Sequence, residues 1–153
     1  MLELHEKINI PTLLTNAESW NLNRSEMEEL ERAEIQSLKC LFDLPSHTPT
    51  PAILFTLGTL YTSHRVNQKR LIHLHRILNR SEHNWTLKIL RVLDNVTLGW
   101  AKSIREALSH YDLPTDFSTI RAIPRRKWIK LVKAKIEIKN TQRLISECHK
   151  KEG

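Results

Sequence analysis

Glycine is nearly absent from this sequence of 153 residues, which contains only three. A β-rich fold needs many tight turns, and glycine is the residue that most easily adopts their left-handed backbone conformations. The shortage therefore argues against such a fold. It also excludes a glycine-rich phosphate-binding loop, because Gly58, Gly99 and Gly153 lie too far apart to form one.

Cysteine is scarcer still, with only Cys40 and Cys148, far apart in the sequence. They supply no C-x-x-C pair for zinc or redox chemistry. Two isolated cysteines are typical of a reducing compartment, so we expect Cys40 to be a buried thiol and Cys148 an exposed one. A single disulfide between them is the alternative.

Catalytic and metal-binding patterns are missing as well. The sequence has no G-x-S-x-G nucleophile elbow. His73 and His75 lie two residues apart, which would place them on different faces of a helix and makes them a poor metal pair. Serine, histidine and acidic residues occur, but no spacing singles out a triad. We therefore expect no enzymatic activity from this chain alone, no cofactor and no bound metal.

Long apolar runs are also lacking. No stretch of eighteen or more apolar residues occurs, so no transmembrane helix is predicted. The first ten residues, MLELHEKINI, include acids where a signal peptide would have a basic start and an apolar run. The large exposed aromatic face of interfacial helices is absent too. We expect an intracellular protein, cytoplasmic or nuclear, without a membrane partner.

The net charge of +7 is unevenly distributed along the chain. Residues 1–44 carry nine acids and four bases, a net charge of −5, whereas residues 45–153 carry eight acids and twenty bases, a net charge of +12. Such a division favours an acidic part that faces solvent or a protein partner and a basic part that faces a polyanion. Nucleic acid is the commonest polyanion.

The clearest pattern is the basic stretch Arg65–Arg80. If this stretch is helical, its basic side chains share one face within an arc of roughly 80°. This basic face consists of Arg65, Lys69, His73, Arg76 and Arg80. Leu71, Leu74 and Leu78 lie on the opposite side. A solvated helix usually mixes charges of both signs, whereas this face has no acid, which indicates an anionic partner. The alternative is an ordinary solvated helix that binds nothing.

A second basic surface is predicted on a C-terminal helix over residues 124–149, in which Pro124 is well placed at the first position. Trp128, Val132 and Ile136 are expected to pack inward with Leu131. The basic residues predicted to contact an anion are Arg125, Arg126, Lys130 and Lys133. Basic and apolar residues are less clearly divided between two faces here than in the basic stretch. A solvated helix that binds nothing is therefore again the alternative.

Periodicity and capping signals predict an all-α fold, a bundle of about seven helices. The expected elements are a helix over 2–20 interrupted at Pro11, then helices over 25–42, 51–58, 65–79, 85–93 and 98–111, a short turn over 115–120 and the helix over 124–149. Leu44–Pro51 holds three prolines and is expected to form a rigid loop between the second and third helices. Two capping boxes, Asn23 with Glu26 and Ser25 with Glu28, fit the start of the second helix equally well.

Four stretches together resemble a known family. Glu6–Trp20 looks like the kinked helix ending in E-x-W that follows the polymerase core of non-LTR retrotransposon (LINE-like) reverse transcriptases. Leu44–Ala52 resembles their L-P-x-S-T-P-x-x-A segment, and His75–Arg80 resembles their H-R-I-L-N-R helix end. The lysine-rich segment Trp128–Glu147 is also similar. The resemblance covers nearly the whole chain, and its specificity comes from the order and spacing of these motifs.

The resemblance implies a thumb-like helical bundle over residues 1–80 and a helical linker module over residues 81–153. In that family, this region follows the catalytic palm and cradles the template–primer or the element's own RNA, which implies phosphate contacts for the arginines and the lysine of the basic face. The palm with its paired aspartates, the cysteine–histidine knuckle and the nuclease motif are missing from this sequence. The chain therefore looks like a severed, non-catalytic piece of such an enzyme.

Taken together, these features predict sequence-independent binding of nucleic acid, with RNA or an RNA–DNA hybrid as the expected ligand. The acidic N-terminal helices offer an alternative surface, for a protein partner. The competing hypothesis is a structural or protein-interaction helical bundle, the remnant of a decayed element, with no nucleic-acid role. Salt dependence separates the two, because only phosphate binding weakens steeply as salt rises.

Overall fold

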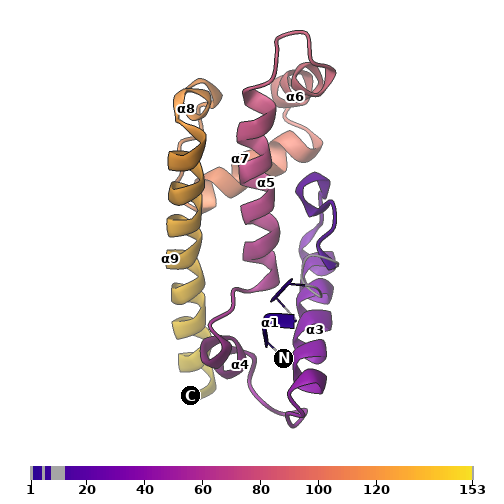
Figure 1. Cartoon of the computed structure of the whole chain (residues 1–153), viewed down its shortest axis with the longest axis vertical. Helices are drawn as coiled ribbons and strands as arrows, with labels where there is room; N and C mark the ends of the chain where they lie inside the picture. The colour runs from indigo at the N-terminus through magenta and orange to yellow at the C-terminus, as the bar shows by residue number, and fades with distance from the viewer. Residues whose placement is uncertain (1, 5, 8–12, 153) are drawn as a thin grey trace. The chain divides into compact units, whose positions relative to one another are not determined.

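The computed structural model describes residues 2–4, 6–7 and 13–152, and these residues form an all-α fold, as the sequence predicts. No β-strand occurs among them. Seven α-helices of six residues or more lie in this part of the chain (Figure 1): α3 Arg24–Leu41, α4 Thr50–Leu57, α5 Thr62–Leu78, α6 Trp85–Asn95, α7 Gly99–His110, α8 Phe117–Ala122 and α9 Arg125–Glu152. A short helix, α1 Leu2–Leu4, and a 3-10 turn, η2 Ala17–Ser19, precede them. None of the helices described is long and apolar enough to cross a membrane.

The chain divides into two compact units, and each is assembled from segments that are distant in the sequence. Unit 1 consists of Met1–Asn16, Leu22–Val66 and Lys139–Gly153, and unit 2 consists of Ala17–Asn21 and Asn67–Ile138. Residue 80, the expected boundary between the thumb-like bundle and the linker module, lies inside unit 2. The assignment of those two modules stays a prediction.

Unit 1 has a small apolar core between α3 and α4. Its buried residues are Leu38, Ile53, Leu54 and Tyr61. The start of α3 is fixed by one of the two capping boxes that the sequence allows. The side-chain oxygen of Asn23 accepts a hydrogen bond from the backbone N–H of Glu26 at 2.9 Å. In return, the backbone N–H of Asn23 donates to the Glu26 carboxylate at 2.7 Å. A cap of this kind stabilises a helix by about 1 kcal/mol.

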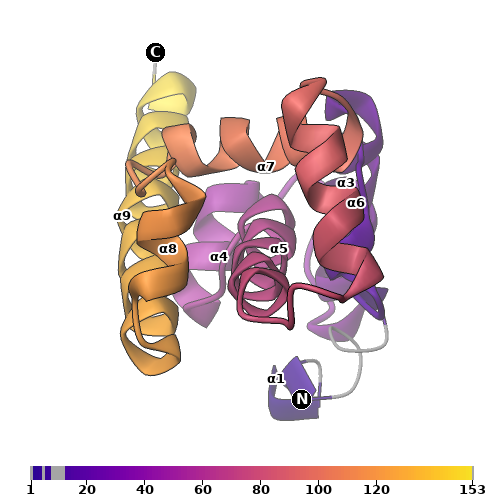
Figure 2. The ribbon, with the colours of Figure 1, turned by 90° about the horizontal axis from the view of Figure 1, so that it is seen from above.

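Unit 2 packs around Trp128 of α9, whose side chain has no exposed surface. The indole Nε1–H donates to the carbonyl of Leu71 on α5 at 2.9 Å. His75, one turn further along α5, stacks on the indole with 6.2 Å between ring centroids and 18° between ring planes. The His75 Nε2–H donates to the carbonyl of Ile123 at 2.7 Å. These contacts hold the C-terminal end of α5 against the α8–α9 connection, with α6 on the other side of α5 (Figure 2).

Two predictions are wrong. The helix expected to continue to Trp20 is broken, because Asn16 has a left-handed backbone (φ 59°) and only the 3-10 turn follows it. The expected kink at Pro11 lies outside the described residues. Cys40 is exposed rather than buried, and both cysteines are free thiols. Leu38, two residues earlier, occupies the buried side of α3 instead.

Candidate nucleic-acid interface

Arg65, the first residue of the basic face, lies in unit 1 and is engaged by acidic side chains. Its Nη1 and Nη2 atoms donate to the Glu6 carboxylate at 3.1 Å and 2.7 Å, and its Nε atom lies 3.9 Å from a carboxylate oxygen of Glu34. Only 15% of the Arg65 side chain is exposed. An external phosphate would have to compete with Glu6 for this guanidinium, so Arg65 is a poor candidate for a nucleic-acid contact.

The middle of the basic face supplies little exposed charge. Lys69 is half-buried. His73 is also half-buried and meets the ring of Trp100 edge-on, with 6.4 Å between centroids. Burial lowers the pKa of His73, and the nearby charges of Arg76 and Arg80 lower it further, with Glu18 opposing them. Because its ordinary pKa is about 6.5, His73 is largely neutral at physiological pH.

The end of the basic face opens into a groove that the sequence did not reveal. Arg76 of α5, Arg80 in the turn after α5, Arg121 of α8 and Arg125 of α9 line one concavity of 640 Å³ in unit 2. We call it the arginine groove. Its other described lining residues are His75, Asn79, Ala122, Ile123 and Pro124, and none of the lining residues described is acidic. The structure thus brings together members of both predicted basic surfaces and adds Arg121, which no sequence pattern singled out.

Arg121 and a second arginine bond to the same acidic residue, Glu82. Its Nη1 atom donates to the Glu82 carboxylate at 2.9 Å, and Arg91 donates to the same carboxylate at 2.5 Å and 3.1 Å. The hydrogen bonds from Arg91 and Arg121 lower the pKa of Glu82 to about 2, so this carboxylate stays charged at neutral pH. One negative charge is divided between two guanidinium groups, which leaves the neighbourhood of the groove positive.

The positive charges of the other three groove arginines are less neutralised by nearby acids. Arg76 and Arg125 are exposed, and Arg80 donates from Nη1 to the neutral hydroxyl of Thr86 at 3.2 Å. Among the residues that the structure describes, no carboxylate forms an ion pair with Arg76, Arg80 or Arg125. Three positive charges that converge on one concavity without carboxylate partners repel one another, and an anion in the groove would relieve that repulsion.

The second predicted surface extends from the groove along α9. Arg126, Lys130 and Lys133 are exposed, whereas Trp128 and Val132 are buried, as the periodicity predicts. The first turn of α9 contains no acidic residue. Basic side chains at this end oppose the positive pole of the helix macrodipole, an arrangement that a bound anion makes favourable.

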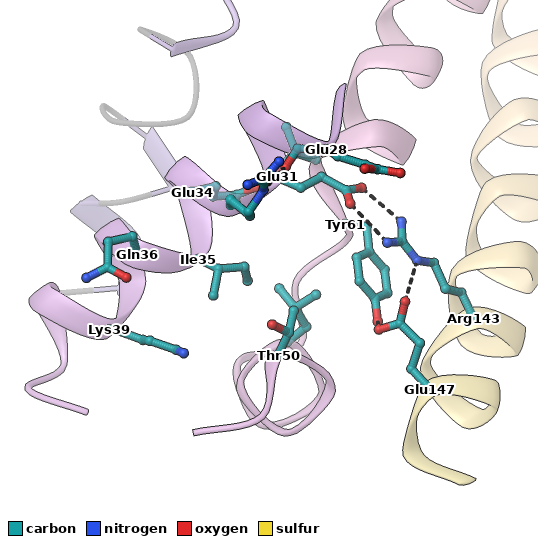
Figure 3. Close-up of a pocket in the computed structure, with 13 residues that line it drawn as sticks. Glu28, Glu31, Glu34, Ile35, Gln36, Lys39, Thr50, Tyr61, Arg143 and Glu147 are labelled. Carbon is teal, nitrogen blue, oxygen red and sulfur yellow. Dashed lines mark hydrogen bonds and ion pairs between the residues drawn. The ribbon is translucent and has the colours of Figure 1, made fainter. Parts of the chain in front are cut away.

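A second concavity, of 490 Å³, lies in unit 1, and three of its charged lining residues, Glu31, Arg143 and Glu147, are paired with one another (Figure 3). Arg143 of α9 donates to both carboxylate oxygens of Glu31 at 2.8 Å and 2.9 Å, and its Nε donates to Glu147 at 3.0 Å. The Tyr61 hydroxyl donates to Glu147 at 2.6 Å, and the guanidinium carbon of Arg143 lies 3.7 Å from the centroid of the Tyr61 ring. We call these four residues the Arg143 network. It joins α3 to α9 within unit 1. Glu31, one of the acids of residues 1–44, is therefore paired inside the fold and is not available to a protein partner.

Glu34 lines the same pocket and makes the stability of the protein depend on pH. Only 2% of its surface is exposed, and this burial raises its pKa to about 7, partly opposed by Arg65 and reinforced by Glu6 and Glu31. In the unfolded chain, Glu34 has its ordinary pKa of 4.5. Between pH 4.5 and about 7, the folded protein therefore keeps a proton on Glu34 that the unfolded chain has lost. The contribution of Glu34 to stability is therefore fully present below pH 4.5 and is lost as the pH rises through 7. We expect this loss to reach about 2 kcal/mol.

Urea unfolding of the wild type and of Glu34→Gln at about pH 5 and about pH 7.5 measures this effect. The glutamine variant removes the titrating group while keeping the shape. The free energy of unfolding of the wild type is expected to fall relative to that of the variant as the pH rises. A difference between the two proteins that stays constant, or grows in favour of the wild type, would contradict the burial of an ionisable Glu34.

No protein-family model matches the chain, and neither curated proteins nor solved structures show a significant similarity to it. In the described part of the chain, no cluster of three histidine, cysteine, aspartate or glutamate residues could hold a metal ion. The candidate site is therefore defined by the geometry of the arginine groove itself.

Proposed function

We propose that this protein binds the phosphodiester backbone of nucleic acid through the arginine groove, without reading sequence and without catalysing a reaction. The observation that carries the proposal is the convergence of four arginines, three from helices and one from the turn after α5, on one concavity with no acid among its described lining residues. Exposed Arg126, Lys130 and Lys133 of α9 would extend the track of phosphate contacts beyond the groove.

The chemistry of arginine supports a phosphate ligand over other anions. A guanidinium group presents a planar fork of donors that fits two phosphate oxygens at once, and it stays charged at every physiological pH. Such charge-assisted hydrogen bonds are about twice as strong as neutral ones. Several of them along a track would bind a polymer of phosphates far better than an isolated ion, because each contact releases condensed counterions.

RNA or an RNA–DNA hybrid is the proposed polymer. This choice rests on the resemblance to the thumb and linker of non-LTR retrotransposon reverse transcriptases, which hold template and primer. The structure changes which residues are proposed for that role. Arg65 is engaged by Glu6, and His73 is largely neutral, so Arg76, Arg80 and the two arginines of α8 and α9 take over the contacts.

The second candidate is a protein-interaction or structural bundle. It is favoured by a row of exposed apolar side chains on and after α6: Trp85, Ile89, Val92, Val96 and Leu98. An apolar interface would hardly respond to salt, whereas phosphate binding loses affinity with a log–log slope near −0.7 to −0.9 per contact.

The test is fluorescence anisotropy with a labelled RNA hairpin, an RNA–DNA hybrid and a DNA duplex, each at several salt concentrations. The groove variant, in which all four groove arginines are replaced by glutamine, runs beside the wild type. We expect the groove variant to lose at least about a hundredfold in affinity for RNA near 50 mM salt, because it lacks four phosphate contacts. Weak wild-type binding that neither salt nor the four substitutions change would refute the proposal.

A further inference from the structure

Trp85 is the most unusual surface residue of unit 2, because a large aromatic side chain at the first position of α6 is 75% exposed. The helix buries Leu87 and Leu90 instead, which are 1% and 3% exposed. The helix start at Trp85 is capped, because the side chain of Asn84 accepts a hydrogen bond from the backbone amide of Thr86 at 3.0 Å. Trp85 is thus an exposed ring on an ordered helix start.

The face of this ring already attracts positive charge. The Nζ atom of Lys88, one turn along α6, lies 5.0 Å from the centroid of the Trp85 ring. A lysine held over an exposed indole by a cation–π contact is also placed to meet a phosphate beside the ring. Apolar ring and positive charge are the two groups that proteins use together to hold single-stranded nucleic acid.

Direct contacts join the start of α6, where Trp85 lies, to residues of the arginine groove. Arg80, which lines the groove, donates to the hydroxyl of Thr86, the residue that follows Trp85. The Glu82 carboxylate provides a second connection, because it accepts hydrogen bonds from both Arg91 of α6 and Arg121 of α8. A strand whose phosphates lie in the groove at Arg80 would therefore pass the start of α6.

We propose that Trp85 is a stacking platform for an unpaired base, and that the ligand of the groove is nucleic acid with a single-stranded segment. Arg76 and Arg80 hold phosphates of that strand, the indole of Trp85 stacks on a base, and Lys88 contacts the phosphate beside it. This inference rests on the phosphate-binding function proposed for the groove. It adds that a fully paired blunt duplex lacks one of the contacts, because all of its bases are stacked within the helix.

The test compares a short single-stranded RNA with a blunt RNA duplex, using the full chain and anisotropy at fixed salt. We expect Trp85→Ala to weaken binding of the single strand about tenfold and to leave duplex binding nearly unchanged. Trp85→Phe should keep most of the affinity, because it keeps an aromatic face. The salt slope should change by no more than about one contact, since Lys88 is the one proposed phosphate contact beside the substitution. Val92→Ala is the matched control, because Val92 is 61% exposed on the same helix and has no ring.

The outcomes separate this inference from the function on which it rests. Unchanged single-strand binding by Trp85→Ala, together with a large loss in the groove variant, would refute stacking and leave the phosphate groove standing. No effect of either substitution would refute both proposals. Equal losses for Trp85→Ala and Val92→Ala, or a change of sedimentation coefficient in both, would overturn stacking and identify the exposed side of α6 as a protein interface.

Discussion

Replacement of Trp128 by alanine is expected to lower the free energy of unfolding by about 4 kcal/mol. The indole has no exposed surface, it stacks on His75, and its N–H bonds to the carbonyl of Leu71 at 2.9 Å. The substitution removes this apolar volume and the hydrogen bond that the indole donates to the Leu71 carbonyl. Urea unfolding followed by far-UV circular dichroism measures the loss.

The chain offers a matched control in Trp85, a tryptophan on another helix of the same unit. Trp85→Ala removes the same atoms from a side chain that is 75% exposed, so its effect on stability should be small. Trp128→Phe should fall between the two alanine variants, because it keeps an aromatic ring and loses the indole N–H. Similar losses for Trp128→Ala and Trp85→Ala would contradict the packing of unit 2 described above.

Replacement of Arg143 by methionine is expected to lower the free energy of unfolding by about 3 kcal/mol, because it leaves a largely buried carboxylate without its partner. The Glu31 side chain is only 13% exposed and receives two hydrogen bonds from Arg143. Burial alone would raise the pKa of Glu31, but the hydrogen bonds from Arg143 and Ser63 bring it below its usual value. Without Arg143, the pKa of Glu31 should rise.

The double variant Arg143→Met, Glu31→Gln distinguishes a lost ion pair from lost packing. Removing the charge of Glu31 as well should restore part of the stability, which gives a coupling energy in a double-mutant cycle. Strictly additive effects would mean that Arg143 acts mainly through its contacts with the Tyr61 ring and Glu147. The exposed pair Arg24–Glu28 is the comparison, because breaking it should cost less than about 1 kcal/mol.

The helices could be predicted because their signals are local. Periodicity and caps within a few residues give α3, α5, α7 and α9 their approximate bounds, and the Asn23 capping box was one of two registers open from the sequence. The continuation of the first helix to Trp20 failed because a single left-handed residue, Asn16, interrupts it. No local preference in the sequence requires that conformation at an asparagine, although asparagine tolerates it better than most residues.

The candidate site could be predicted only in part, because it depends on contacts between distant segments. The spacing along the basic stretch groups Arg76 with Arg80, which line the same groove, but it could not show that Glu6, 59 residues from Arg65, pairs with that arginine. Arg121 lies in a short helix with no periodic basic pattern, so only the packing of α8 beside the end of α5 brings it to the groove. Helical periodicity identifies faces, whereas tertiary packing decides which charges remain available.

The most direct test of the proposed function compares the groove variant with a variant of equal charge. The control carries glutamine at four exposed basic positions that do not line the groove: Arg24, Arg32, Lys102 and Lys150. Both variants lower the net charge by four, so an effect of overall charge alone would be the same in each. The measurement is the log–log salt dependence of binding to the RNA hairpin, between about 50 mM and about 200 mM salt.

If the groove binds phosphates, the slope of the groove variant should become shallower by about 3, which corresponds to four contacts at about 0.7 each, while the control keeps the slope of the wild type. Equal slopes in the two variants would contradict a localised phosphate site. They would show instead that the basic surface attracts RNA only through its overall charge, or that the fold serves another purpose.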